Sequence, residues 1–258
     1  MNTQKVYVLT PSQSKRLIAK GIIQEPLFEH SLQNGKIFIG RGSTNAYIVE
    51  ELYKKNNIKE SFNKAEYMAG IIFAEQTKCS WGVNKGRIAP ELIFESGVPR
   101  KIENRIEQIK KFGRNDLILK GANAIDRNGV PAVLIRAQDG GTIGSLYPFI
   151  AVKGLKVMCP IGLEKQVNED LIEISQLMGM EYVVDGAGMI PMPFAEPFTE
   201  IDALEVLFNC EAYHLASGGI WGAEGSVSLL VITEDPEELQ RIDDFMLEIL
   251  QEPNFIHP

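Results

Sequence analysis

The sequence predicts an α/β protein with a mostly parallel, Rossmann-like sheet and helices on both faces. Short runs of β-branched and other apolar residues alternate with amphipathic stretches, which is typical of parallel strands connected by helices. Glycine-rich loops follow several of the expected strands, and glycine lets a chain turn sharply from a strand into a helix. We predict a single domain over residues 1–258, with Gly154 as the position where a smaller C-terminal α/β portion would begin if the chain were divided.

The first half of the chain shows the expected alternation. Thr10 is a suitable N-cap and Pro11 suits the first helical position, so a helix is expected directly after the first strand. We expect strands at residues 5–9, 36–39, 67–73 and 116–119, and helices at residues 11–19, 45–55 and 104–112. The stretch from Gly82 to Pro99 is rich in glycine and proline, and we interpret it as an excursion from the core.

The second half continues the same pattern. Pro191, Pro193 and Pro197 indicate a long turn, and Thr199 is expected to cap the helix that follows. The final helix carries apolar residues at the spacing of one helical face. We expect strands at residues 132–135, 156–159, 182–184 and 226–232, and helices at residues 143–152, 168–178, 199–208 and 236–250.

The composition argues against several classes of function. A net charge of −8 argues against nucleic acid as the main partner, although backbone N–H groups can bind a phosphate without a basic surface. The three cysteines lie far apart and the three histidines lack metal-ligand spacing, so we predict a reducing compartment, no metal and no cofactor. We find neither a signal peptide nor an apolar run of membrane-spanning length, and we therefore expect a cytoplasmic protein without membrane contacts.

The first candidate binding loop is the GRGST segment, which lies between an expected strand and an expected helix. Gly40 and Gly42 would let the backbone approach a ligand closely, and the start of the helix would direct free N–H groups at an anion. Ser43 and Thr44 add hydroxyl donors, and Arg41 adds a guanidinium for oxyanions. The alternative is a helix start that Ser43 or Thr44 caps after a tight turn.

The second candidate is the polar turn KGANAIDRNG, which begins at the end of the strand at residues 116–119. Ligands of open α/β sheets lie at such strand ends. Lys120, Gly121, Asn123 and Asp126 fall within one short turn and could supply charge, amide and carboxylate to a single site. A polar β-turn with solvated charges is the alternative.

The third candidate is the segment QDGGTIGS, again between an expected strand and an expected helix. Asp139, Gly140, Gly141 and Thr142 open this helix, so the argument from free N–H groups applies here too. We expect the loops after Ile39, Leu119 and Ile135 to open on one edge of a parallel sheet and to form one anion site.

The order of these three segments resembles that of the ribose-phosphate isomerase and CoA-transferase-like superfamily, over roughly residues 36–152. GRGST resembles the phosphate loop of ribose-5-phosphate isomerases, and KGANAID resembles a degenerate copy of the DGADE turn that carries their catalytic acids. GANAIDRNG followed by GGTIGSLYPFIA is similar to a pair of motifs in methylthioribose-phosphate isomerases and related initiation-factor subunits. The resemblance implies a phosphorylated ligand and an oligomeric protein.

The departures from that pattern argue against a plain ribose-phosphate isomerase. Lys120 and Asn123 stand where those isomerases have two aspartates, and neither replaces the carboxylate that moves a proton between sugar carbons. The helix after the third loop also lacks the glutamate of the isomerases. Asp126, Asp139 and Lys120 remain available for other chemistry or for binding alone.

Other candidates lie outside these loops. Cys79 follows Lys78, which would lower the pKa of its thiol and favour a nucleophile, but a buried, inert cysteine is the alternative. The glycine-rich run from Ser217 to Gly225 is a candidate flap in which Trp221 stacks on a ligand and Glu224 acts as an acid. A hairpin turn or an oligomer contact would explain the same run. The apolar residues in it lead us to expect a homo-oligomer.

We therefore predict that the chain binds a small phosphorylated or otherwise anionic metabolite, either a sugar phosphate or a nucleotide-like compound. As an enzyme it would be an isomerase, transferase or lyase whose reacting groups are Lys120, Asn123, Asp126 and Cys79. The alternative is a non-catalytic metabolite sensor or regulatory oligomer on the same fold. A third possibility, a CoA-ester or lactate-utilisation-type protein, lacks a glutamate nucleophile in a recognisable loop.

Overall fold

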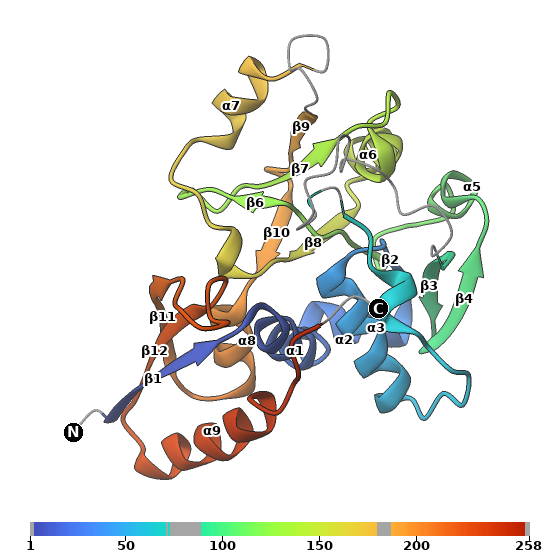
Figure 1. Cartoon of the computed structure of the whole chain (residues 1–258). Helices are drawn as coiled ribbons and strands as arrows, with labels where there is room; N and C mark the ends of the chain where they lie inside the picture. Colours follow the sequence, from blue (N-terminus) through green and yellow to red (C-terminus); the bar gives the residue numbers. More distant parts are fainter. Residues whose placement is uncertain (1–2, 71, 73–88, 180–186, 256–258) are drawn as a thin grey trace.

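The computed structural model describes residues 3–70, 72, 89–179 and 187–255. A central sheet with strand order β10-β8-β5-β2-β3-β4 forms the framework of these residues (Figure 1). Its strands are β2 (Lys36–Ile39), β3 (Glu91–Glu95), β4 (Val98–Ile102), β5 (Leu117–Leu119), β8 (Lys156–Pro160) and β10 (Ala195–Phe198). The expected strands at residues 36–39, 116–119 and 156–159 are thereby confirmed.

The central sheet is mixed, and not mostly parallel as we expected. β10, β8, β5 and β2 are parallel neighbours, whereas β3 and β4 add to β2 as an antiparallel hairpin. Ser96 and Gly97 form the hairpin turn with positive φ angles of 50° and 77°, as a two-residue turn between strands requires. The Ser-Gly pair between two β-rich runs is therefore the signal that our interpretation of this stretch as an excursion overlooked.

Alternate residues of the central strands face two separate hydrophobic cores, which is why the run IFI at residues 37–39 is apolar throughout. Ile37 and Ile39 of β2 belong to one core, and Phe38 between them belongs to the other. The first core is covered by α1 (Pro11–Ile22), α2 (Pro26–Asn34), α3 (Ser43–Lys55) and α8 (Glu200–Leu207), and the second by α5 (Arg105–Ile109) and α6 (Gly141–Lys153). The α/β class and the helices on both faces are thus present.

The strand before the third glycine-rich loop lies outside the central sheet, contrary to our expectation of one sheet edge. β7 (Pro131–Ile135) pairs antiparallel with β6 (Ala124–Ile125) and with β9 (Gly188–Pro191) in a small separate sheet. The turn of residues 126–130 folds β7 back onto β6, so the strand cannot continue beside β5. The short helix η1 (Leu163–Lys165) and α7 (Leu171–Leu177) follow β8.

The first strand of the chain and its last two strands form a third sheet. β1 (Thr3–Leu9) and β11 (Glu211–Ser217) both pair antiparallel with β12 (Val227–Thr233), and α9 (Pro236–Ile249) packs on this sheet. Figure 1 shows this part at the lower left, away from β3 and β4. No helix of the described residues is both long enough and apolar enough to span a bilayer.

Our prediction of a strand at residues 67–73 is wrong at the positions that the structure describes, residues 67–70 and 72. Instead, α4 (Lys64–Tyr67), capped by the Asn63 side chain, ends at Tyr67, and residues 68–70 belong to no helix or strand. The Tyr67 ring is fully buried, its hydroxyl donates to the Ile39 carbonyl at 2.5 Å, and it accepts from the Leu92 N–H at 3.1 Å. These tertiary bonds to β2 and β3 stabilise a conformation that β propensity alone does not predict.

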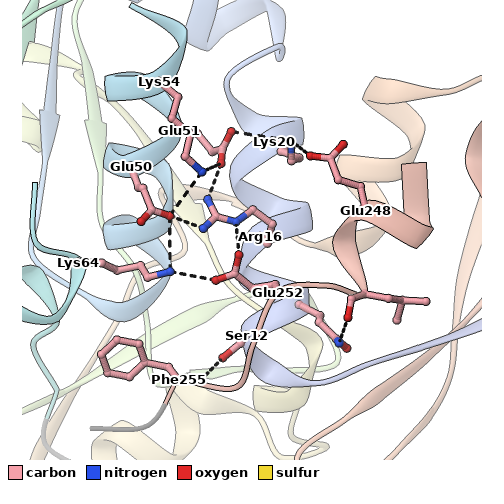
Figure 2. A network of polar contacts seen from close by, with 12 residues as sticks. Ser12, Arg16, Lys20, Glu50, Glu51, Lys54, Lys64, Glu248, Glu252 and Phe255 are labelled. Atoms are coloured by element: carbon pink, nitrogen blue, oxygen red, sulfur yellow. Dashed lines mark hydrogen bonds and ion pairs between the residues drawn. The ribbon is translucent and has the colours of Figure 1, made fainter. Parts of the chain in front are cut away.

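A buried charge network fixes α1 against α3 and the C-terminal segment (Figure 2). The Arg16 guanidinium contacts the carboxylates of Glu50 and Glu51 and donates from Nε to Glu252 at 2.8 Å. Lys64 reaches Glu252 at 3.0 Å and also contacts Glu50. Only 6 % of the Arg16 side chain is exposed, so its charge depends on these carboxylates for compensation.

Candidate functional site

A cavity of about 500 Å³ opens where β2 and β5 end, and all three predicted loops contribute to its wall. Ligands of α/β sheets commonly lie at this edge, outside the carboxyl ends of parallel strands. The lining residues are 41–45, 68–70, 72, 120–123, 133–137, 141–143 and 165. The structure thus brings the three segments together even though β7 belongs to a different sheet.

The first loop holds the start of α3 close to the end of β5. The Gly40 N–H donates to the Leu119 carbonyl at 2.9 Å, and a β-carbon on Gly40 would lie 3.3 Å from that oxygen. The Asn45 side chain donates to the Gly40 carbonyl at 2.7 Å and fixes the loop from inside. Arg41, Gly42, Ser43 and Thr44 line the cavity, whereas Gly40 lies behind them. The N–H groups of the first turn of α3 have no partner within the helix and are available to a ligand.

The second loop places one amine and one amide in the wall. Lys120 follows β5 directly, and its Nζ donates to the Gly121 carbonyl at 2.8 Å. Burial lowers the pKa of the Lys120 ammonium, and Lys165 and Arg105 contribute in the same direction. Asn123 accepts the Leu134 N–H on its Oδ1 at 3.0 Å.

Asp126 does not line the cavity, although it belongs to the same turn. It is buried, and its Oδ1 accepts the N–H groups of Asn128 at 2.8 Å and Val130 at 2.9 Å. Its Oδ2 accepts the Leu171 N–H at 3.2 Å, which ties the turn to the start of α7. Backbone donors therefore occupy both oxygens, and the geometry assigns this carboxylate to holding the turn.

The third loop contributes the start of α6. Gly140 and Gly141 have left-handed φ angles of 75° and 62°, and a side chain at Gly140 would clash with Gly144. Gly141 and Thr142 line the cavity, whereas Asp139 and Gly140 do not. The Asp139 carboxylate accepts the Gly141 N–H at 2.9 Å, so it holds the turn that leads into α6.

The lining carries four cationic side chains and, among the described residues, no carboxylate. The cations are Arg41, Lys120, Arg136 and Lys165. Arg136 ends the β7 segment, and Lys165 lies in η1 with its Nζ donating to the Ala122 carbonyl at 3.2 Å. Our sequence reasoning missed Arg136, Lys165 and the lining residue Asn45. The same strand-end rule, applied to β8, would have pointed to the segment that contains Lys165.

Two of the remaining candidates lie elsewhere. Trp221 and Glu224 belong to the hairpin turn between β11 and β12, and neither lines the cavity. Trp221 is 94 % exposed, and Glu224 accepts the Gly222 N–H at 3.0 Å within the same turn. Cys79 lies outside the described residues, as does the strand expected at residues 182–184.

A buried carboxyl that our sequence reasoning missed follows β10 at the same edge of the sheet. Glu200 is fully buried at the start of α8, and its two oxygens accept the Leu163 N–H at 3.0 and 3.2 Å. Burial raises the pKa of the Glu200 carboxyl, and the neighbouring Glu164 raises it further. No group of three or more potential metal ligands is present in the described parts of the chain.

Fold and site together define an α/β protein with a cationic cavity at the ends of its parallel strands. The sequence matches no protein-family model and no curated protein sequence. Function is therefore inferred from the geometry and chemistry of the cavity.

Proposed function

We propose that the chain binds a small phosphorylated or otherwise anionic metabolite, a sugar phosphate or a nucleotide-like compound, in this cavity. The observation that carries the proposal is the cavity wall, with its four cations and no carboxylate among the described residues, in a chain of net charge −8. Cations gathered in one concave site repel one another and attract an anion, and the starts of α3 and α6 add N–H donors beside them. The volume of about 500 Å³ is that of a small-molecule site.

A second cavity, of about 390 Å³, has a different character. Its lining includes Glu60 and Glu66 beside a single lysine, Lys101, whose Nζ is paired with Glu60 at 2.6 Å. The carboxylates would repel an anion, and none of the described lining residues belongs to a glycine-rich loop. The cationic cavity is therefore the better candidate for an anionic ligand.

The proposal leaves two roles for the bound metabolite. Isomerase- or transferase-type chemistry is the first, within the superfamily that the three motifs resemble, in a cytoplasmic homo-oligomer. A non-catalytic sensor is the alternative, and it is favoured by the absence of a carboxylate from the described lining and by the structural use of Asp126. Lys120, which lines the cavity, favours the enzyme.

A thermal-shift screen of sugar phosphates, nucleotides and CoA esters tests the proposal. A ligand at about one hundred times its dissociation constant should add about 2.7 kcal/mol to the free energy of unfolding. Arg41→Met should remove much of that shift, whereas Arg114→Met, which removes an exposed arginine outside the lining, should leave it unchanged. The proposal fails if no anion stabilises the protein, or if both variants respond as the parent does.

A further inference from the structure

The Lys120 amine differs from the cations of the Arg16 network. Arg16 and Lys64 are compensated by carboxylates, but in the described part of the chain Lys120 makes no ion pair. Its Nζ donates to a neutral acceptor, the Gly121 carbonyl, at 2.8 Å. An ammonium in such a place is costly, because burial removes water, and the carboxylate that acts on it from a distance, Glu91, is already paired with Arg105 at 2.8 Å.

Among the described residues of the wall, Lys120 and Lys165 are the two that carry an amine, and the Lys165 Nζ donates to the Ala122 carbonyl at 3.2 Å. The guanidinium groups of Arg41 and Arg136 keep their protons, and Asn123 contributes only an amide. Desolvation and neighbouring cations both favour the uncharged form of a lysine, so a larger fraction of its amine is unprotonated than in an exposed lysine. An unprotonated amine can attack a carbonyl carbon. Lys120 therefore combines a nucleophilic atom with a wall that holds negative charge.

We propose that Lys120 forms a Schiff base with the carbonyl carbon of an anionic aldehyde or ketone bound in this cavity. The ammonium first gives one proton to solvent water. The Nζ lone pair then forms the N–C bond while the C=O π electrons move to oxygen, and a proton passes from nitrogen to that oxygen. The resulting carbinolamine takes back one proton from solvent, loses its oxygen as water and leaves an iminium, which carries the same single positive charge as the original ammonium. This inference rests on the proposed function, because the anionic part of the metabolite is held by the cations and helix starts of the cavity.

The position of Lys120 in the fold suits this role. It is the first residue after β5, and its backbone N–H donates to the Met158 carbonyl at 3.1 Å, which anchors the root of the side chain. The starts of α3 and α6, at Ser43 and Gly141, line the same cavity. A metabolite can therefore place its anionic group at either helix start while its carbonyl carbon faces the amine.

Reductive trapping tests the proposal on the full chain. Dihydroxyacetone phosphate, ribose 5-phosphate and pyruvate are the carbonyl probes, each incubated with the protein and sodium cyanoborohydride at neutral pH. sn-Glycerol 3-phosphate, which has a phosphate but no carbonyl, reports binding alone. Peptide mass spectrometry then locates the secondary amine that reduction of an iminium leaves behind.

The expected result is an adduct at Lys120 with at least one probe, in at least about tenfold excess over exposed lysines such as Lys156. Because burial lowers the pKa of Lys120, a larger fraction of its amine is uncharged at neutral pH than for an exposed lysine. Lys120→Met should abolish this adduct and melt no lower than the parent, because it removes a desolvated charge that makes no ion pair with the described residues. Lys120→Arg keeps the charge and should bind sn-glycerol 3-phosphate without being trapped. Lys156→Met removes an exposed lysine at the start of β8, outside the cavity lining. This variant should form the Lys120 adduct to the same extent as the parent.

The outcomes separate this inference from the proposed function. Stabilisation by sn-glycerol 3-phosphate or by any carbonyl probe, without an adduct at Lys120, overturns the Schiff base and leaves anion binding standing. An adduct spread evenly over exposed lysines overturns it as well. If none of the four compounds binds and none is trapped, the inference fails together with anion binding for these ligands.

Discussion

Gly42 occupies the N-cap of α3, and a side chain there would enter the cavity. Its backbone is extended, with a φ of 166°, and an added β-carbon would meet nothing within 4 Å. Gly42→Val should therefore fold normally but fill space at the anion site, lowering the affinity for the ligand found in the screen by at least about tenfold, or 1.4 kcal/mol. Isothermal titration calorimetry measures the affinity, and thermal unfolding checks the fold.

The matched control for Gly42→Val is Gly113→Val. A β-carbon on Gly113 also meets nothing within 4 Å, and this glycine lies in the loop before β5, outside the cavity lining. The control should bind as the parent does. If Gly42→Val binds equally well, the GRGST loop is only a helix start and not part of an anion site.

A substitution at Asn123 tests the charge of the cavity wall, whereas Gly42→Val tests the space inside the cavity. In Asn123→Asp the carboxylate would still accept the Leu134 N–H, while its second oxygen would bring negative charge to the cavity wall. Repulsion in a partly desolvated site should weaken phosphate binding by about tenfold or more. The same substitution restores the carboxylate of the isomerases, so ribose 5-phosphate isomerisation is assayed beside calorimetry.

Asn128→Asp is the control for this substitution. Asn128 is exposed in the same turn but does not line the cavity, so the variant has the same net charge without the local repulsion. Equal binding by both aspartate variants would show that Asn123 does not face the ligand.

At the scale of elements, the Arg16 network decides how firmly α1 is attached to α3 and the C-terminal segment. Arg16→Met leaves three carboxylates near one another without their shared cation, and we expect a loss of about 3 kcal/mol in the free energy of unfolding. Arg100→Met, which breaks an exposed pair with Glu95, should cost less than about 1 kcal/mol. Urea unfolding measures both, and equal losses would contradict a structural role for the network.

The same network makes stability depend on pH. Although burial opposes the effect, hydrogen bonds from Arg16 hold the pKa values of Glu50 and Glu252 below their usual 4.5. Carboxyl groups with a lowered folded pKa stabilise the fold above the unfolded value, and this stability is lost as the pH falls through the folded value. Between about pH 5 and pH 3 the parent should therefore lose stability more steeply than Arg16→Met. Parallel pH curves for the two proteins would contradict the assignment.

For the whole molecule, the outer face of the β1-β12-β11 sheet favours the homo-oligomer that we predicted. Val6, Val8, Tyr213 and Leu215 are about half exposed on its two edge strands, and Trp221 projects from the hairpin with a positive φ of 59°. Exposed apolar groups that gather on one sheet often mark a contact surface. Multi-angle light scattering at micromolar concentration should show an oligomer, and Leu215→Glu should shift it toward the monomer. A monomeric parent would contradict the prediction.

Local signals in the sequence determined much of this protein. Apolar runs predicted β2, β5 and β8, and Thr10 and Thr199 marked helix starts, because short-range propensity and capping decide such elements. The three glycine-rich loops that were expected to share a site do line one cavity. Tertiary structure decided the rest. The Asp126 carboxylate accepts backbone N–H groups and does not line the cavity. A tight turn folds β7 back onto β6, so β7 belongs to a separate sheet. Lys165 lines the cavity from η1, the short helix that follows β8. These outcomes depend on partners distant in sequence, which local propensity does not encode.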